Sequence, residues 1–277
     1  MKLIKIKPSQ IVAYPFLVVF VCFSVFPIFW MVSSAIKPST EIYSIPPKIF
    51  TSFTLQHFRY MLFETHTIRY FLNSLIVASI TTLISLSFAL PGGYGLARFN
   101  FKMKNAISIA ILFSQMLPLA VLLIPLYMVL AFLGLLDTYL GLILTYLGFA
   151  IPLTTWLLRG FFAGIPKELE EAAMIDGCTR FQALMRVLVP VAMPAIIATG
   201  VYSFMVAWEE FLFALSFTSS DRVRTLPIGI NSFIGEYGVD WGAVMASSTL
   251  ASLPIIVLFM IFYEQFISTF TEGMIKG

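Results

Sequence analysis

Six apolar runs divide the chain, and each has the length of a membrane-spanning helix. A helix that crosses a bilayer needs about 20 mainly apolar residues. Runs of this kind lie at residues 11–36, 70–96, 106–133, 139–158, 189–217 and 243–267. Pro118 and Pro125 interrupt the third run, where each removes a backbone hydrogen-bond donor. The pattern predicts an all-α, polytopic membrane protein with six transmembrane helices and both termini on one side.

We expect three parts along the chain. Residues 1–69 would hold a short N-terminus, the first span and a polar outer loop. The first apolar run is too long for a signal-peptide core and lacks a convincing cleavage site, so it is interpreted as a retained span. Residues 70–266 would form a core domain with the other five spans, and residues 267–277 a short tail.

Composition excludes an ordinary soluble domain. Of the 277 residues, 59% are hydrophobic and 11% are charged, with a mean hydropathy of +0.93. Soluble domains are nearer a quarter charged. The net charge of +3 is mild, and no basic patch suggests nucleic acid. Cys22 and Cys178 lie far apart in different kinds of segment, which argues against a disulfide framework.

The basic residues predict the orientation, because lysine and arginine are enriched on the cytoplasmic side of membrane proteins. Six spans place the termini, the turn after span two and the loop after span four on one side. That side carries eleven of the 17 basic residues: Lys2, Lys5, Lys7, Arg98, Lys102, Lys104, Arg159, Lys167, Arg180, Arg186 and Lys276. The other side carries six: Lys37, Lys48, Arg59, Arg69, Arg222 and Arg224. The N- and C-termini are therefore predicted to be cytoplasmic.

One polar segment on the predicted cytoplasmic side has strong helix signals. Pro166 suits a first helical position, and Gly177 suits the residue that ends a helix. The segment 167–176 is therefore predicted as a short helix, with three carboxylates near its positive end: Glu168, Glu170 and Glu171. Thr179 and Gln182 have capping-box spacing. They would begin a second helix with four apolar residues on one face: Phe181, Leu184, Met185 and Leu188.

The spacing within this segment resembles the EAA loop of ABC importer permeases. That pattern is E-A-A, three residues, G, nine residues and I-x-L-P; here it is Glu171-Ala172-Ala173, Gly177 and Val187-Leu188-Val189-Pro190, with two valines replacing isoleucine and leucine. The resemblance implies that a loop at about 160–190 forms a coupling helix in a cleft of a separate ATP-hydrolysing subunit. The coupling residues would be Glu171, Ala172, Ala173, Asp176, Gly177 and Pro190. The alternative interpretation is an amphipathic helix lying on the membrane between two spans.

The sequence contains no nucleotide site or catalytic set of its own. The phosphate-binding pattern G-x-x-x-x-G-K-[ST] does not occur. His57 and His66 share a polar loop with Glu41 and Glu64, without nucleophile or metal-ligand spacing, and we expect these histidines to be solvated. The chain is predicted not to be an enzyme and to hold no metal or cofactor. The resemblance places ATP and Mg²⁺ in the partner ATPase.

Two adjacent carboxylates, Glu209 and Glu210, stand in the fifth apolar run. Charged groups inside a membrane are costly and often functional, so Trp208, Glu209, Glu210 and Phe211 are predicted as a candidate substrate path. The alternative is a helix end at the membrane interface, with Trp208 in the aromatic belt.

The same segment resembles sugar-type importer permeases, which commonly carry W-N-[DE]-F-L-x-A-L followed by an R-T-L-P-like segment. Here Glu209 replaces the asparagine, and Arg224-Thr225-Leu226-Pro227 follows. Further segments resemble the carbohydrate branch that includes the maltose permease G subunit: Pro27-Ile28-Phe29-Trp30, Ser34-Ala35-Ile36-Lys37, Phe71-Leu72-Asn73-Ser74, Tyr94-Gly95-Leu96-Ala97-Arg98-Phe99 and Gly134-Leu135-Leu136-Asp137-Thr138.

The resemblance implies a type I ABC importer transmembrane fold, with 70–266 as its core domain. It implies a maltose/trehalose-type sugar permease in the prokaryotic plasma (inner) membrane. The expected partners are a dimer of ATP-binding subunits, a second homologous permease, an extracytoplasmic solute-binding protein, a sugar or oligosaccharide, and membrane lipid. The alternatives are a stand-alone secondary transporter or channel, which would be expected to show inverted repeats, and an ABC permease for a non-sugar solute.

Overall fold

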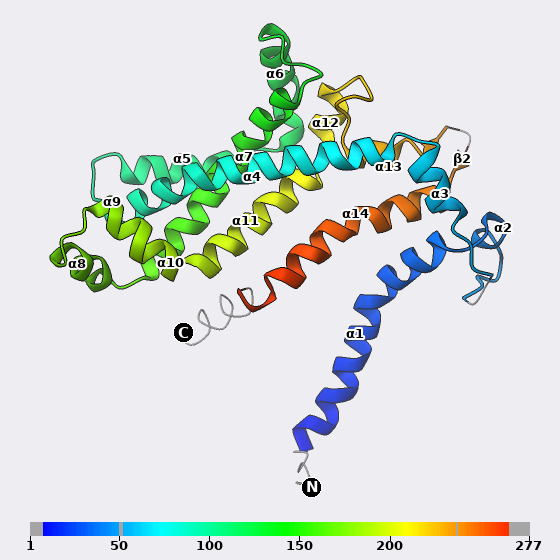
Figure 1. The fold of residues 1–277 in the computed structure, drawn as a ribbon, viewed down its shortest axis with the longest axis horizontal. Coiled ribbons are helices and arrows are strands. Elements are labelled where there is room, and N and C mark those ends of the chain that lie inside the picture. The colour runs from blue at the N-terminus through cyan, green and yellow to red at the C-terminus, as the bar shows by residue number, and fades with distance from the viewer. Residues whose placement is uncertain (1–7, 50–51, 237, 266–277) are drawn as a thin grey trace. The chain divides into compact units, whose positions relative to one another are not determined.

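A computed structural model describes residues 8–49, 52–236 and 238–265 of the chain (Figure 1). The described chain divides into two compact units, one formed by residues 1–68 with 230–252 and the other by residues 69–229 with 253–277. The first seven residues and the predicted tail at 267–277 lie outside the described residues.

The first unit contains the N-terminal helix and a small polar region. Its elements are α1 (Pro8–Ala35), α2 (Ser39–Ile42), α3 (Gln56–Phe63), β1 (Ile234–Gly235), β2 (Gly238–Val239) and the first part of α14 (Trp241–Ile261). The two strands pair antiparallel, with Ile234 opposite Val239. The expectation that His57 is solvated is wrong. Its ring is buried against Gly242, and its Nε2 lies 3.0 Å from the carbonyl oxygen of Lys37.

The second unit contains the remaining long helices, and α7 packs against α5 and α11 within it. Its elements are most of α4 (Thr67–Arg98), α5 (Lys104–Met116), α6 (Leu119–Phe132), α7 (Tyr139–Gly164), α8 (Lys167–Ile175), α9 (Arg180–Ala183), the π-helix η1 (Leu184–Leu188), α10 (Val189–Val191), α11 (Met193–Trp208), α12 (Leu212–Phe217), α13 (Leu226–Asn231) and the end of α14.

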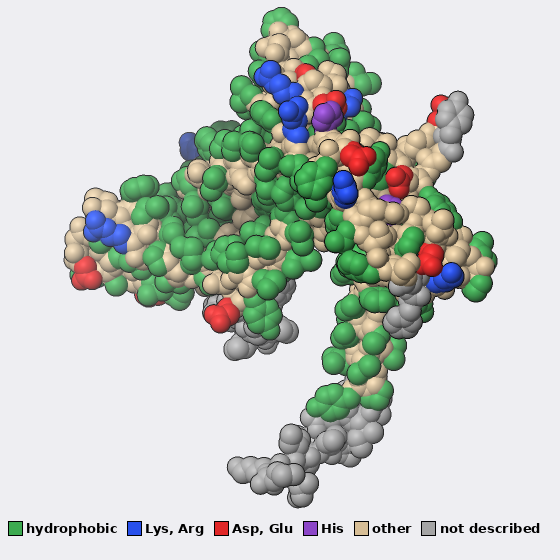
Figure 2. All heavy atoms as spheres, turned by 45° about the vertical axis from the view of Figure 1, so that its right-hand side comes forward, with side chains coloured by type: hydrophobic (Ala, Val, Ile, Leu, Met, Phe, Trp, Pro, Cys, Tyr) green, Lys and Arg blue, Asp and Glu red, His purple; other side chains and the backbone are tan. Residues whose placement is uncertain are grey.

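The described helices match the predicted number of membrane spans when two bent pairs are included. Residues 14–35 of α1 and the helices α4, α7 and α14 are each long and apolar enough to cross a membrane. Two helix pairs also qualify as single broken spans, which gives up to six among the described residues. Figure 2 shows hydrophobic side chains over much of the visible helix surface, as lipid-facing helices require.

The third and fifth spans are broken; an interruption by Pro118 and Pro125 was expected in the third, whereas the fifth was expected to be continuous. In the third, α5 and α6 meet at a bend of 100° beside Pro118, whereas Pro125 lies inside α6 without a break. In the fifth, the segment Arg180–Val191 meets α11 at a bend of 80°. The fifth span was expected to run to residue 217, but α11 ends at Trp208 and a separate helix, α12, follows.

Close helix approach organises the core of the second unit near the C-terminal end of α4. A Cβ added to Gly93 would lie 3.0 Å from the backbone nitrogen of Arg159 and 3.0 Å from the Cβ of Leu158, so glycine is needed for this contact between α4 and α7. One apolar core here joins α4, α7, η1 and α11. Its members are Ala89, Tyr94, Leu158, Phe162, Leu184, Leu188, Ala192 and Ile196.

Candidate functional site

The helix α8 forms almost as predicted. It runs from Lys167 to Ile175, one residue shorter than expected at its C-terminal end, and Pro166 lies one position before its first residue. Gly177 has a φ of +91°, the left-handed conformation that glycine adopts without strain. The Gly177 N–H donates to the Met174 carbonyl at 3.1 Å, and the next N–H, of Cys178, donates to the Ala173 carbonyl at 3.0 Å. These paired bonds end the helix in a Schellman motif.

The predicted capping box is present at the start of α9. The Gln182 N–H donates to the Thr179 hydroxyl oxygen at 3.3 Å, and the Thr179 N–H donates to the Gln182 side chain at 2.9 Å. The prediction that Phe181, Leu184, Met185 and Leu188 share one face is wrong. Leu184 is buried, whereas Phe181 is 69% exposed. A turn of π-helix from Leu184 to Leu188 interrupts the α-helical register on which that face depended.

A buried carboxylate attaches α8 to the C-terminal end of α4. Glu170 is 6% exposed. Its Oε1 accepts a hydrogen bond of 2.5 Å from the Tyr94 hydroxyl. Its Oε2 lies 3.2 Å from Nε of Arg98, an ion-pair distance without the alignment of a hydrogen bond. Arg98 also donates from Nη2 to the carbonyl oxygen of Ile165 at 2.9 Å, so it holds the chain entering α8 as well.

The residues predicted to contact an ATPase lie on the surface of this loop, with one exception. Five are exposed in the chain: Glu171, Ala172, Asp176, Gly177 and Pro190. Ala173 is buried beside Glu170 on the attached face of α8. Glu170 was expected only to place a charge near the helix end, and its attachment to α4 was not predicted. A signal was available, because residues three apart share a helix face and Ala173 permits close approach.

The break after α11 is stabilised by Glu210. Its carboxylate accepts hydrogen bonds from the N–H groups of Phe213 at 2.8 Å and Ala214 at 3.0 Å, which start α12. The Tyr146 hydroxyl of α7 donates to the same carboxylate at 2.7 Å. Glu210 thus caps one helix and joins it to another. This explains why the chain leaves the helical path after Glu209 instead of continuing through the apolar run.

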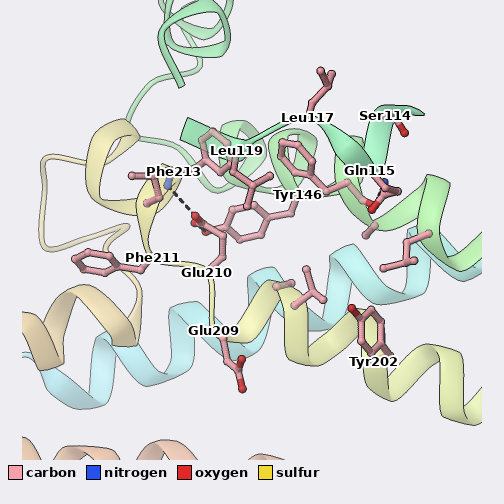
Figure 3. A pocket seen from close by; sticks show the side chains of 16 residues that line it. Ser114, Gln115, Leu117, Leu119, Tyr146, Tyr202, Glu209, Glu210, Phe211 and Phe213 are labelled. Carbon is pink, nitrogen blue, oxygen red and sulfur yellow. Dashed lines mark hydrogen bonds between the residues drawn. The ribbon is translucent and has the colours of Figure 1, made fainter. Parts of the chain in front are cut away.

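The four residues of the predicted substrate path have different environments. In Figure 3 the side chain of Glu210 points toward Phe213 and Tyr146, whereas that of Glu209 points away from them. Glu209 is exposed. Trp208 is 4% exposed, with its ring 5.6 Å from the rings of both Phe71 and Phe204.

A pocket of about 500 Å³ lies where the two broken spans meet (Figure 3). Its walls come from α5, the break before α6, α7, α11 and the break before α12. Glu209, Glu210 and Phe211 line it, and Trp208 is not among its lining residues. Six of the residues that line it have polar side chains: Ser114, Gln115, Tyr146, Tyr202, Glu209 and Glu210. The pocket can therefore offer hydroxyl, amide and carboxylate groups to a polar ligand of limited size.

Three sequence segments noted separately come together at the opposite end of α4. The side-chain amide of Asn73 donates to the carbonyl oxygens of Arg222 at 3.1 Å and Arg224 at 2.8 Å. The Ser74 hydroxyl oxygen accepts from the Leu226 N–H at 2.8 Å. The Tyr139 hydroxyl donates to the Asn73 side-chain oxygen at 2.8 Å. These bonds attach the segment 219–226 to α4 and α7.

Asp137 attaches the start of the same segment. Its Oδ1 accepts from the N–H groups of Ser219 at 2.9 Å and Ser220 at 3.0 Å. Burial alone would raise the pKa of Asp137, but the hydrogen bonds from Ser220 and Ser219 outweigh burial and hold the pKa below its ordinary value. The carboxylate is therefore ionised, and able to accept both bonds, at neutral pH.

Comparison with known families identifies the class of protein. Residues 89–271 match the family described as "Binding-protein-dependent transport system inner membrane component". The chain belongs to this family. It is a transport family of multi-pass membrane proteins, in agreement with the predicted class.

Individual relatives and solved structures agree with this assignment. The chain is 38% identical to the diacetylchitobiose uptake system permease protein DasC of Streptomyces coelicolor over 91% of this chain and 92% of that protein. It is 33% identical to the trehalose/maltose transport system permease protein MalG of Thermococcus litoralis over 91% of each. A bacterial ABC transporter involved in alginate import is similar in fold, with a TM-score of 0.78 at 20% identity, covering 96% of this chain and 99% of that one. This likeness confirms the predicted type I ABC importer transmembrane fold.

Proposed function

We propose that this chain is a transmembrane permease subunit of an ATP-binding-cassette importer for a sugar or oligosaccharide. Its family supports the transport role. Relatives named for diacetylchitobiose and for trehalose/maltose, each aligned over nine-tenths of the chain, support the carbohydrate class. The observation that carries the proposal is the form of α8, a short capped helix attached by Glu170 with Glu171 and Ala172 exposed beside it.

The exposed side of α8 would seat in the ATP-hydrolysing subunit. A helix of about three turns is too short to be stable alone, and its attachment to α4 supplies the missing support. ATP and Mg²⁺ would be bound by a dimer of these partner subunits and not by this chain. The excess of lysine and arginine on this side supports a cytoplasmic position for α8 and both termini, in a prokaryotic inner membrane.

The pocket between the broken spans would form this chain's part of the sugar path. Broken membrane helices commonly line transport sites because their backbone can face a polar ligand there. Tyr202, Gln115 and Glu209 could hydrogen-bond to sugar hydroxyls, while apolar side chains contact the ring faces. A second homologous permease would complete the path. An extracytoplasmic solute-binding protein would deliver the sugar to the opposite side, near the loops 37–69 and 218–240.

ATP binding would close the partner dimer and displace α8. The displacement can switch access to the pocket only if α8 binds its cleft differently in the two states, because otherwise no free energy is transmitted. In this proposal the permease supplies the path and the attachment points, and the chemistry of ATP hydrolysis stays in the partner.

Co-expression with the neighbouring genes tests the proposal. The complex should contain this chain, a second permease and an ATPase dimer. In liposomes, its ATP hydrolysis should rise when the solute-binding protein and the correct sugar are added, across a panel of neutral, amino and acidic saccharides. Solute flux through this chain reconstituted alone would favour a stand-alone transporter or channel. Stimulation by a non-sugar solute and by no saccharide would favour the other alternative.

A further inference from the structure

The last turns of α4 hold both short helices of the α8–α9 loop. Tyr94 and Arg98 contact Glu170 of α8. The next residue, Phe99, lies under the guanidinium of Arg180, whose Cζ is 5.3 Å from the ring centroid. Tyr94, Arg98 and Phe99 belong to the segment Tyr94–Phe99, which in the sequence carried only a family resemblance. Its place in the structure gives the segment a specific task, which is to hold the loop.

The contacts of Glu170 are suited to transmit movement because they are buried. The side chains of Arg98 and Glu170 are 6% and 8% exposed. Water competes little with such a pair, and removing one partner leaves the other as a buried charge without compensation. Tyr94 is itself packed in the core, with its ring 6.2 Å from that of Phe162. A displacement of α8 therefore cannot leave Tyr94 and Arg98 behind without breaking these bonds.

The other end of α4 holds the segment 219–226. Asn73 and Ser74 are bonded to the backbone of Arg222, Arg224 and Leu226. Between Asn73 and Tyr94 the helix is continuous, and at 1.5 Å per residue these contacts are about 30 Å apart. Figure 1 shows α4 passing from the α13 end to the α8–α9 end of this unit. One helix thus bears the attachment points of both segments.

We propose that Glu170 is the positioning residue that joins α8 to α4, so that movement of α8 is carried along α4 to the segment 219–226. This inference rests on the proposed function of α8 as the coupling helix. It gives the two adjacent glutamates different roles. Glu171 is exposed and faces the ATPase, whereas Glu170 is buried and faces α4. Transmission along a helix requires two discrete arrangements at its ends, and the bonded segments at both ends provide the contacts that would differ.

The test uses the complete importer with its ATPase, second permease and solute-binding protein. The variants are Glu170→Gln, which removes the charge at nearly constant volume, and Tyr94→Phe, which removes one hydroxyl. Glu264→Gln is the matched control, because it makes the same charge change at an exposed position outside the α8–α9 loop. Three quantities are measured: ATPase co-purification, the ratio of sugar-stimulated to unstimulated ATP hydrolysis, and the labelling rate of Arg222→Cys in a background without Cys22 and Cys178.

Glu170→Gln is expected to keep the ATPase bound while the stimulation ratio falls about fivefold or more, the lower range of coupling between sites. Tyr94→Phe should change the ratio in the same direction by less, and Glu264→Gln should match the wild type. In the wild type the labelling rate of Arg222→Cys should differ between nucleotide-free and ATP-trapped complex, and Glu170→Gln should remove that difference.

Wild-type stimulation and labelling in Glu170→Gln would overturn the inference, as would an equal loss in Glu264→Gln. If Glu170→Gln fails to assemble, Tyr94→Phe decides, and an unchanged ratio there would overturn the inference. A failure of the proposed function looks different, because the wild-type complex itself would then lack an ATPase or show no sugar stimulation.

Discussion

The hydroxyl of Tyr146 lies 2.7 Å from Oε2 of Glu210. The neighbouring residue, Glu209, is exposed and lines the same pocket. The adjacent carboxylates of Glu209 and Glu210 therefore have different roles. Glu210 is engaged by Tyr146 and by two backbone N–H groups, while the Glu209 side chain points away from all three (Figure 3). The pair predicted from sequence as one substrate site contains one structural group and one group available to a ligand.

Substitution separates these two roles. Glu210→Ala should destabilise the chain by about 2–4 kcal/mol, because it removes a helix cap and leaves the Tyr146 hydroxyl without its acceptor. Glu209→Ala should change stability by no more than about 0.5 kcal/mol, but should alter the sugar concentration needed for half-maximal ATPase stimulation. The measurements are thermal unfolding and stimulated hydrolysis of the purified complex. Equal melting temperatures for the two variants would contradict this assignment.

We expect Gly177 to be required because of its backbone conformation, and not because a side chain would clash there. Apart from its two chain neighbours, no described residue has an atom within 4 Å of the position of an added Cβ, but φ is +91°. Gly177→Ala should therefore cost about 1–2 kcal/mol and weaken coupling to the ATPase. Gly177→Asn should cost less, because asparagine tolerates this conformation. Gly164→Ala is the control, since it also meets open space, without a positive φ. The measurement is uptake by all three variants. Uptake at the wild-type rate in Gly177→Ala would contradict the requirement for glycine at this positive φ.

The α8 helix could be predicted closely because its signals are local. A proline before it, a glycine after it and the Thr179–Gln182 capping box act within a few residues, and their hydrogen bonds do not depend on the rest of the fold. The number of spans was also available, since it follows from the apolar runs. The family resemblance added the fold and the expected role of the loop.

The sequence did not predict which of the two prolines breaks the third span, nor the break after Trp208. Pro118 and Pro125 give the same local signal, yet the chain bends at one and stays helical at the other. Glu210 ends the expected helix by capping α12 and meeting Tyr146, which is 64 positions earlier in the chain. Glu170 likewise pairs with Tyr94, 76 positions away. Such contacts are decided by tertiary packing and leave little trace in the local pattern.

The two glycines near the end of α4 should respond differently to a methyl group. Gly93→Ala would force α4 and α7 apart, because the added Cβ meets the backbone of Arg159 at 3.0 Å, and overpacking of this kind costs about 1–3 kcal/mol. Gly95→Ala is the control, since its nearest neighbour is a Phe99 ring atom at 4.0 Å. The measurement is the melting temperature of the complexes that carry each variant. An unchanged melting temperature in Gly93→Ala would show that α4 and α7 are less tightly packed at this point.

We expect Asn73 to protect the segment 219–226 from proteolysis. Asn73→Asp keeps the side-chain shape but replaces the donor with a carboxylate that faces the carbonyl oxygens of Arg222 and Arg224. Loss of the two hydrogen bonds should raise local opening, and hence trypsin cleavage after Arg222 and Arg224, by roughly tenfold. Asn100→Asp makes the same change at an exposed position and should leave the cleavage rate unchanged. Equal rates in the two variants would place the support of this segment elsewhere.

The most direct test of the account is sugar-stimulated ATP hydrolysis and uptake by the reconstituted importer carrying Glu171→Lys on the exposed face of α8. The variant is expected to stay in the membrane and to lose both stimulation and uptake, because the reversed charge faces the partner cleft. Uptake at the wild-type rate in this variant, or solute flux through liposomes that contain this chain alone, would contradict the claim that α8 receives the force of a separate ATPase.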